Sequence, residues 1–153
     1  MKTTPIIPLL KKAYASELQT VQNYLAYLVW LDSLHAQQVF DAVAKDVADE
    51  LEHAKRLAQR LVELGVPPSG SQAVPRNLEA LQMADDPGSL RRVVAGALTT
   101  ESDAIATYQE IIATSRGTDP VTADLAARIL ADEKAHRGRF TGLLRDMNKA
   151  LAA

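Results

Sequence analysis

Cysteine is absent from the 153-residue chain, and its absence excludes several chemistries at once. Without thiols the protein can form no disulfide, no thiolate nucleophile, no Cys-ligated zinc site and no iron–sulfur or rubredoxin-type centre. Long apolar runs are also lacking. None approaches the roughly 20 residues of a membrane span, and the stretch before Lys11 is too short for the apolar part of a signal peptide. We therefore expect a cytoplasmic protein with no membrane partner.

An excess of positive charge is missing as well. The chain has 17 Lys and Arg residues against 19 Asp and Glu residues, a net charge of −2. Phosphate backbones are bound by surplus Lys and Arg, so no nucleic-acid partner is expected. Hydrophobic residues make up 47% and charged residues 24%, which is typical of a globular protein. The length fits a single domain over residues 1–153.

The apolar residues that are present recur at steps of three and four, which is the spacing of one helix face. This pattern predicts four helices of about 25–30 residues, covering residues 10–31, 40–64, 90–111 and 120–147. Gly65 marks the end of the second helix and Gly117 the end of the third. Ser89 and Asp119 stand where N-caps are expected, and Pro120 is suited to a first helical position. No segment shows the alternation of a strand.

The connections between these helices predict the topology. The first and second helices, and the third and fourth, are joined by a few residues each, so each pair should form an antiparallel hairpin. His35 falls in the first of these turns and is expected at the surface. Residues 65–88 are rich in Pro, Gly, Ser and Asp. Extended, these residues span about 80 Å and can cross over along the bundle, with a helical turn at 77–83.

Four glutamates lie in the middle of the predicted apolar faces. Glu17 and Glu101 stand on the first and third helices, and the other two helices carry Glu50-x-x-His53 and Glu133-x-x-His136. A spacing of three places each Glu and its His on the same helix face. Buried carboxylates are costly unless they are neutralised.

Two divalent cations would balance the four carboxylates. Glu17 and Glu50 are separated by 33 residues, and Glu101 and Glu133 by 32, so the two hairpins look like copies of one unit. Two imidazoles complete the donor set and leave open coordination positions. Such a carboxylate-rich set suits iron or manganese, and zinc competes by affinity. We predict that these six residues hold two metal ions about 3.5–4 Å apart.

This arrangement resembles the ferritin-like di-iron carboxylate proteins, whose bundles carry a Glu-x-x-His motif on two helices and one Glu on each of the others. Within them the chain is most similar to bacterioferritins, through Glu17 with Tyr24, Asp49-Glu50-x-x-His53, Glu101, and Asp132-Glu133-x-x-His136. The resemblance implies an all-α, ferritin-like four-helix bundle. It implies that Glu50 and Glu133 bridge two irons, with Glu17 and His53 on one ion and Glu101 and His136 on the other.

The resemblance also implies a function. The chain would oxidise Fe(II) with O₂ or H₂O₂ as a ferroxidase for iron storage or detoxification. It would form a homo-oligomer, which would be at least a dimer and could be a larger cage of many copies. Leu51 stands where bacterioferritins have their haem-ligating methionine, so haem is not expected. Lys45 stands at the position of the histidine of their inner-surface iron site.

Several neighbouring residues have a functional and a structural interpretation. Tyr24 and Tyr108 lie two turns after Glu17 and Glu101. They could donate hydrogen bonds or electrons near the metals, or they could be tyrosines of the apolar core. Asp49 and Asp132 are candidates to orient the histidines, since a metal-bound His usually donates its other N–H to a carboxylate. Arg139 is expected to be a surface charge.

Two alternatives to the ferroxidase remain. One is a small di-iron or di-manganese oxidase or peroxidase of the rubrerythrin-like type, outside any cage. Ala104 argues against it, because rubrerythrin-like proteins carry a second Glu at that position. The other is a helical scaffold module without metal.

Overall fold

The computed structural model describes residues 5–32, 36–76, 78–83 and 85–152. Within these ranges the chain forms four long α-helices and no β-strand: α1 (Ile6–Trp30), α2 (Gln37–Glu63), α3 (Leu90–Ser115) and α4 (Pro120–Ala152). The four predicted helices are confirmed, and α4 is the longest at 33 residues. The expected position of His35 lies outside the described residues.

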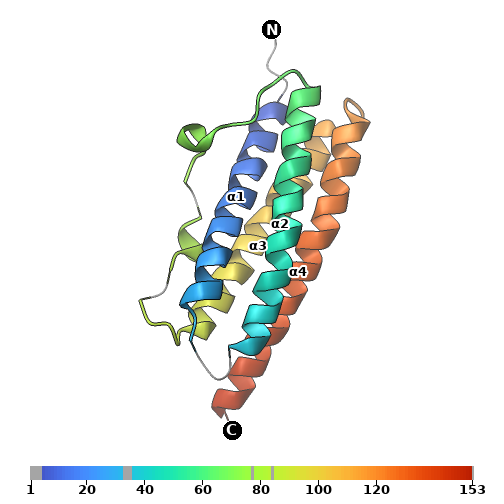
Figure 1. Cartoon of the computed structure of the whole chain (residues 1–153). Coiled ribbons are helices and arrows are strands. Elements are labelled where there is room, and N and C mark those ends of the chain that lie inside the picture. Colours follow the sequence, from blue (N-terminus) through green and yellow to red (C-terminus); the bar gives the residue numbers. More distant parts are fainter. Residues whose placement is uncertain (1–4, 33–35, 77, 84, 153) are drawn as a thin grey trace.

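The helices form an up-down-down-up bundle (Figure 1). The hairpin partners α1 and α2 pack against each other, as do α3 and α4, and the two hairpins join through α1 with α3 and α2 with α4. The long connection between α2 and α3 runs along the outside of the bundle beside α1 (Figure 1). It carries two short 3₁₀ helices, η1 (Ser71–Ala73) and η2 (Glu79–Leu81). The predicted crossover is therefore confirmed, with η2 inside the predicted helical turn.

The helix ends follow the residues that mark them. Gly65 has a φ of +76°, and the N–H groups of Gly65 and Val66 donate to the carbonyls of Val62 and Leu61, which is the Schellman arrangement. At the start of α4, Asp119 accepts a hydrogen bond from the Thr122 N–H at 3.0 Å and so caps the helix. Ser89 stands at the N-cap of α3 but makes no side-chain cap bond.

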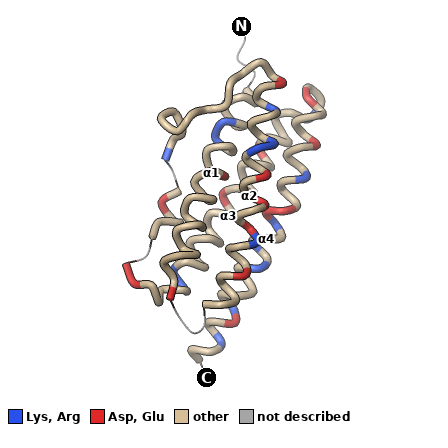
Figure 2. Tube along the Cα trace, viewed as in Figure 1, with Lys and Arg blue, Asp and Glu red and all other residues tan. Residues whose placement is uncertain are grey.

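The apolar core is divided into two clusters. One cluster, at the end where α1 begins, contains Ile6, Leu10, Leu57, Leu61 and Ile129 among its buried members. The other, at the opposite end, is built around residues such as Tyr27, Val43, Val94 and Phe140. Acidic residues lie midway along the bundle (Figure 2). The two clusters hold the helices together on either side of this level, so the buried polar residues between them sit in a rigid frame.

No described helix is both long enough and apolar enough to cross a bilayer.

Candidate metal centre

The six residues predicted as ligands meet in the interior of the bundle. All of them are buried, with side chains from all four helices: Glu17 on α1, Glu50 and His53 on α2, Glu101 on α3, and Glu133 and His136 on α4. They divide into two groups whose potential ligand atoms lie within 4.8 Å of one another. One group is Glu17, Glu50, His53 and Glu133, and the other is Glu50, Glu101, Glu133 and His136. Glu50 and Glu133 belong to both groups, which is the arrangement of two bridging carboxylates.

The two histidines direct equivalent nitrogen atoms at the glutamates. His53 Nδ1 lies 2.9 Å from Glu133 Oε1 and 3.4 Å from Glu50 Oε2. His136 Nδ1 lies 3.2 Å from Glu50 Oε1 and 3.7 Å from Glu101 Oε2. The rings are stacked with their centroids 6.0 Å apart and an interplanar angle of 23°. Both imidazoles therefore border the same small volume from opposite sides of the shared carboxylates.

Several of these buried atoms make no hydrogen bond within the described part of the chain. They are Glu50 Oε2, Glu101 Oε2, Glu133 Oε1, His53 Nδ1 and His136 Nδ1. Such atoms are rare in folded proteins and call for a missing partner. Because all five are oxygen or nitrogen donors that converge, the residues fit a pair of cations better than they fit water or an apolar filling.

The pKa shifts in the cluster indicate which protons the cations would replace. Burial, followed by the charge of Glu17, raises the pKa of both Glu50 and Glu133 well above the ordinary carboxyl value. Burial alone would lower the pKa of His136, but the neighbouring carboxylates of Glu101 and Asp46 raise it to about 9. For His53 burial is again outweighed, here by Glu133, Glu17 and Glu50, and the pKa rises. Without metal, these shifts favour protons on the histidines and on the two shared glutamates.

A second layer of residues supports the six. Tyr24 donates its hydroxyl proton to Glu101 Oε1 at 2.8 Å, and Tyr108 donates to Glu17 Oε1. Burial and the nearby carboxylates raise the pKa of both tyrosines well above 10, so the hydroxyls stay protonated as donors. Both tyrosines are thus in contact with the candidate ligands, and each serves the glutamate of the other hairpin.

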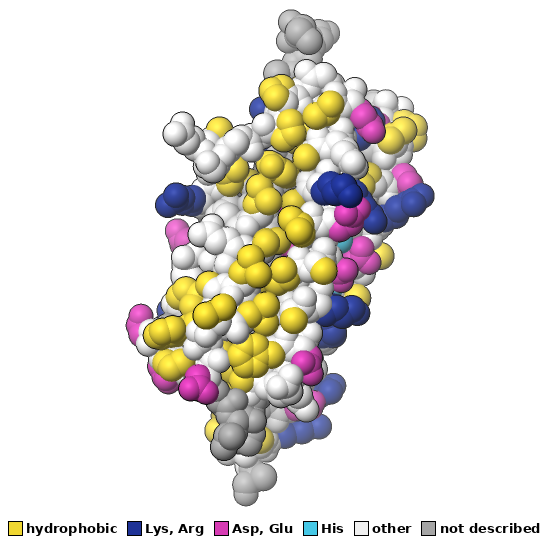
Figure 3. Space-filling view, viewed as in Figure 1, with side chains coloured by type: hydrophobic (Ala, Val, Ile, Leu, Met, Phe, Trp, Pro, Cys, Tyr) yellow, Lys and Arg dark blue, Asp and Glu magenta, His cyan; other side chains and the backbone are white. Residues whose placement is uncertain are grey.

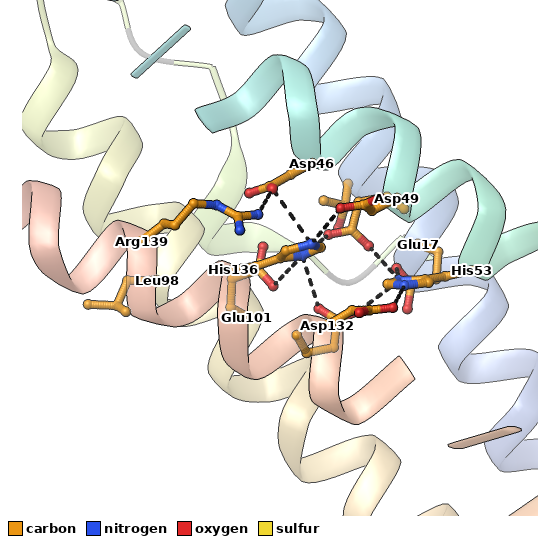
Figure 4. Close-up of polar contacts among 12 residues, drawn as sticks. Glu17, Asp46, Asp49, His53, Leu98, Glu101, Asp132, His136 and Arg139 are labelled. Atoms are coloured by element: carbon orange, nitrogen blue, oxygen red, sulfur yellow. Dashed lines mark hydrogen bonds and ion pairs between the residues drawn. The ribbon is translucent and has the colours of Figure 1, made fainter. Parts of the chain in front are cut away.

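The expected aspartate contacts are present and also cross between hairpins. His53 Nε2 lies 3.1 Å from Asp132 Oδ2, and His136 Nε2 lies 3.3 Å from Asp49 Oδ2 (Figure 4). An acceptor at Nε2 keeps the proton on that nitrogen and leaves Nδ1 free to bind a metal. The geometry therefore favours the tautomer that a ligand histidine needs.

The expectation for Arg139 was wrong. Its guanidinium donates to Asp46, a wholly buried residue of α2 that the sequence analysis did not single out. Asp46 precedes Glu50 by one helical turn, so its place on the buried face could have been found from its register. Leu51, at the position of the haem-ligating methionine, is half-exposed and points away from the buried cluster.

A pocket of about 240 Å³ between α1 and α3 reaches the centre. Its inner wall includes Glu17, Glu50, Glu101 and Glu133, and the small side chains of Ala13 and Ala104 widen it. A small molecule can therefore approach the glutamates from this side of the bundle, opposite the aspartates that face the histidines.

Comparison with known proteins supports this description. Residues 7–150 match the ferritin-like domain family. None of the curated proteins gives a significant match. A solved structure of the bacterioferritin-related protein of Bacteroides fragilis, described as a dodecameric thioferritin, is 24% identical. It superposes with a TM-score of 0.82 over 96% of this chain and 88% of that one.

Two further structures give the same result. A ferritin-like, diiron-carboxylate protein of Bacillus anthracis is 21% identical, with a TM-score of 0.79 over 91% of this chain and 94% of its own. The bacterioferritin of Mycobacterium tuberculosis is 24% identical, with a TM-score of 0.81 over 97% of this chain and 90% of its own. These likenesses agree in fold with the family match, which spans nearly the whole chain, and the protein belongs to the ferritin-like family.

Proposed function

We propose that the protein is a ferroxidase that binds two Fe(II) ions per chain and oxidises them with O₂ or H₂O₂. The observation that carries this proposal is the sharing of Glu50 and Glu133 between two buried donor groups, with five donor atoms left without hydrogen bonds. Family membership and the printed description of one neighbour as a diiron-carboxylate protein support it.

The roles of the residues follow from their positions. Glu50 and Glu133 would bridge the two ions, Glu17 and His53 would complete one set, and Glu101 and His136 the other. With peroxide, two Fe(II) ions each give up one electron, and the peroxide takes up two electrons and two protons to leave two water molecules. With O₂, the same two electrons and two protons leave H₂O₂ instead. The buried position keeps bulk water from the ions.

The pocket between α1 and α3 gives the oxidant a path. It reaches the glutamates directly, and its walls include Lys12 and Thr100. The tyrosine hydroxyls act on the carboxylates, since Tyr24 and Tyr108 each hold one oxygen of a terminal glutamate and leave the other oxygen for metal.

Anaerobic titration with Fe(II), followed by stopped-flow mixing with O₂ or H₂O₂, tests the proposal. Wild type should bind two Fe(II) ions per chain and oxidise both, and Glu50→Ala should lose this while its helices persist. The matched control is Glu52→Ala, on the same helix, because Glu52 lies near the surface and pairs with Arg56. A wild-type protein that binds no Fe(II) would leave a metal-free scaffold as the function. Slow iron oxidation with fast peroxide turnover would favour the rubrerythrin-like alternative.

We also propose that the whole chain acts as one domain and assembles with copies of itself. One neighbour is described as dodecameric. A band of hydrophobic side chains covers the face formed by α1 and α2 (Figure 3). Exposed hydrophobic residues of α1 and α2 include Leu25, Trp30 and Leu51, each about half-exposed. Size-exclusion chromatography with light scattering distinguishes a dimer from a 12- or 24-subunit cage, and a monomer would contradict this part of the proposal.

Metal identity is a separate matter from metal number. The donor set accommodates iron or manganese, with zinc as a competitor. Anomalous scattering at the iron and manganese edges, on protein purified without added metal, would distinguish these ions.

A further inference from the structure

The two hairpins are copies of one unit around the candidate metal centre, with two exceptions. Each candidate ligand and each supporting residue has a counterpart in the other half: Glu17 with Glu101, Glu50 with Glu133, His53 with His136, Tyr24 with Tyr108, and Asp132 with Asp49. The position one turn before the shared glutamate differs. It is Asp46 in α2 and Ile129 in α4, and both side chains are wholly buried. The charge around the two histidines is therefore unequal.

A second difference lies one turn after the histidines. Arg139 follows His136 by three residues, and Arg56 follows His53 by the same spacing. Arg139 turns inward and donates through Nη2 to Asp46 Oδ1 (Figure 4). Arg56 instead donates to Glu52 at 3.0 Å on the surface of α2. The same residue type at the same register thus pairs with a wholly buried aspartate in one half and with a surface glutamate in the other.

The Asp46–Arg139 pair lies against the outer nitrogen of His136. Asp46 Oδ1 is 3.6 Å from His136 Nε2, beside Asp49 Oδ2 at 3.3 Å. Asp46 Oδ2 has no hydrogen-bond partner among the described residues. His53 Nε2 faces one aspartate, Asp132, whose side chain is 51% exposed. His136 therefore has two acidic neighbours at Nε2, one of them shielded from water, and His53 has a single solvated one.

Asp46, Asp49 and His136 have the composition of a third metal site, but Arg139 argues against this use. Its guanidinium already neutralises Asp46 at the position a cation would take. A metal at Nε2 would also remove the proton of an imidazole whose Nδ1 faces the main centre. The arrangement suits a different task, which is to hold the Nε2–H proton of His136 beside a buried carboxylate.

We infer that Asp46 and Arg139 are positioning residues for His136 and that they make the two metal positions unequal, the His136 position holding its ion more tightly. This inference rests on the proposed function, because it requires metal at both histidines. Arg139 holds Asp46 in place, Asp46 keeps the His136 ring in the ligand tautomer and orientation, and among the described residues no equivalent pair faces His53.

Co(II) alone is the probe that tests this inference in the full-length protein. Each Co(II)-bound imidazole gives a hyperfine-shifted, exchangeable N–H signal in ¹H NMR, and His53→Ala and His136→Ala assign the two signals. In wild type the His136 N–H should exchange with D₂O more slowly than the His53 N–H. Stepwise Co(II) titration by visible absorption should show two unequal binding steps.

Two variants disturb the pair without removing a ligand. Asp46→Asn should speed exchange of the His136 N–H alone and lower the affinity of the tighter step about tenfold or more, while the His53 signal stays unchanged. Arg139→Gln should act on the same signal, and it provides the test if Asp46→Asn does not fold. The matched control is Arg56→Gln, which should change neither signal.

The outcomes separate the inference from the proposed function. If wild type shows no Co(II)-shifted imidazole signal, the metal centre itself is refuted. If two signals appear but neither variant alters the His136 signal, the positioning role is refuted and the centre stands. Equal changes in both signals would also overturn the inference, because a general loosening of the bundle affects both halves alike.

Discussion

Tyr24 on α1 donates its hydroxyl proton to Oε1 of Glu101 on α3, with 2.8 Å between the two oxygens. The reverse contact exists too, since Tyr108 on α3 donates to Glu17 on α1. Each hairpin therefore holds a glutamate of the other, and α1 and α3 are connected twice across the level of the candidate metal centre. These bonds matter because a buried carboxylate oxygen that loses its donor keeps the full cost of its lost hydration.

Replacing Tyr24 by Phe tests this relationship. Tyr24→Phe should destabilise the metal-free protein by about 1–3 kcal/mol, because Glu101 Oε1 is left buried without its donor. Fe(II) oxidation should slow by about tenfold or more, since the carboxylate loses its fixed orientation. Chemical denaturation and stopped-flow oxidation measure the two effects. Tyr14→Phe is the control on the same helix, because Tyr14 lines a surface pocket away from the glutamates. Equal effects of both substitutions would contradict the assigned role.

Replacing Glu50 by Gln should raise the stability of the metal-free protein. The pKa of Glu50 is raised by burial and by Glu17, so above the ordinary carboxyl value the folded state binds its proton more tightly than the unfolded state does. This costs stability as pH rises above about 4.5, the ordinary carboxyl value. Each kcal/mol gained in the free energy of unfolding should raise the Tm by about 2–4 °C in a protein of this size.

Thermal melts at two pH values measure this effect. The gain from Glu50→Gln should be present at pH 7 and should disappear as pH falls well below 4.5, where wild-type Glu50 is protonated in both states. Metal at a concentration of 100 times its Kd should add about 2.7 kcal/mol to the stability of wild type and so raise its Tm. The Tm of the variant should not rise with metal. A variant that melts below wild type at pH 7 without metal would contradict the like-charge argument.

Much of this centre follows from spacing alone. The steps of three and four along the chain predict four helices, and the Glu-x-x-His motifs place their side chains on buried faces. The spacing does not predict which residue of another helix each side chain contacts. Tyr24 shares a face with Glu17 yet contacts Glu101, because the neighbouring helix α3 brings that carboxylate within reach. Arg139 borders the apolar face and would be solvated on an isolated helix. It turns to a buried aspartate because α2 places Asp46 opposite it.

Metal binding should release protons. In the metal-free protein the pKa of His136 is raised to about 9, and that of His53 is raised as well. Metal needs the neutral imidazoles and the ionised glutamates, so the protons of the centre are displaced. Metal affinity should therefore rise with pH, and its slope should decrease above about 9, where the His136 proton is already lost. Calorimetric titration with Co(II), in buffers of different ionisation enthalpy, counts the released protons. A proton count of zero at pH 7 would contradict the protonated resting centre.

The same raised pKa values predict how the metal-free protein responds to base. A histidine whose pKa is higher in the folded state stabilises fully below its ordinary value of 6.5, and the contribution is lost as pH rises through about 9. The Tm of the metal-free protein should therefore fall between these pH values. With metal in place the imidazoles carry no such proton, so the metal-loaded Tm should change less over the same range.

Gly96 lies where α3 meets the crossover connection. A Cβ added there would fall far inside van der Waals contact with the Ala80 carbonyl oxygen, and 3.3 Å from its carbon. Because the obstacle is backbone of η2 rather than a flexible side chain, Gly96→Ala must displace the crossover from α3. We expect a loss of about 1–3 kcal/mol, even though alanine is the better helix former.

Gly138 supplies the matched control for this prediction. It is also a helix-interior glycine, on α4, but its added Cβ would meet nothing within 4 Å. Gly138→Ala should therefore stabilise the protein by about 0.4–1 kcal/mol, since only the backbone freedom of the unfolded chain changes. Urea denaturation of both variants measures the difference. Opposite signs would show that the crossover is held against α3 by a contact that only glycine permits, and equal stabilisation would mean that η2 does not lie on α3 in solution.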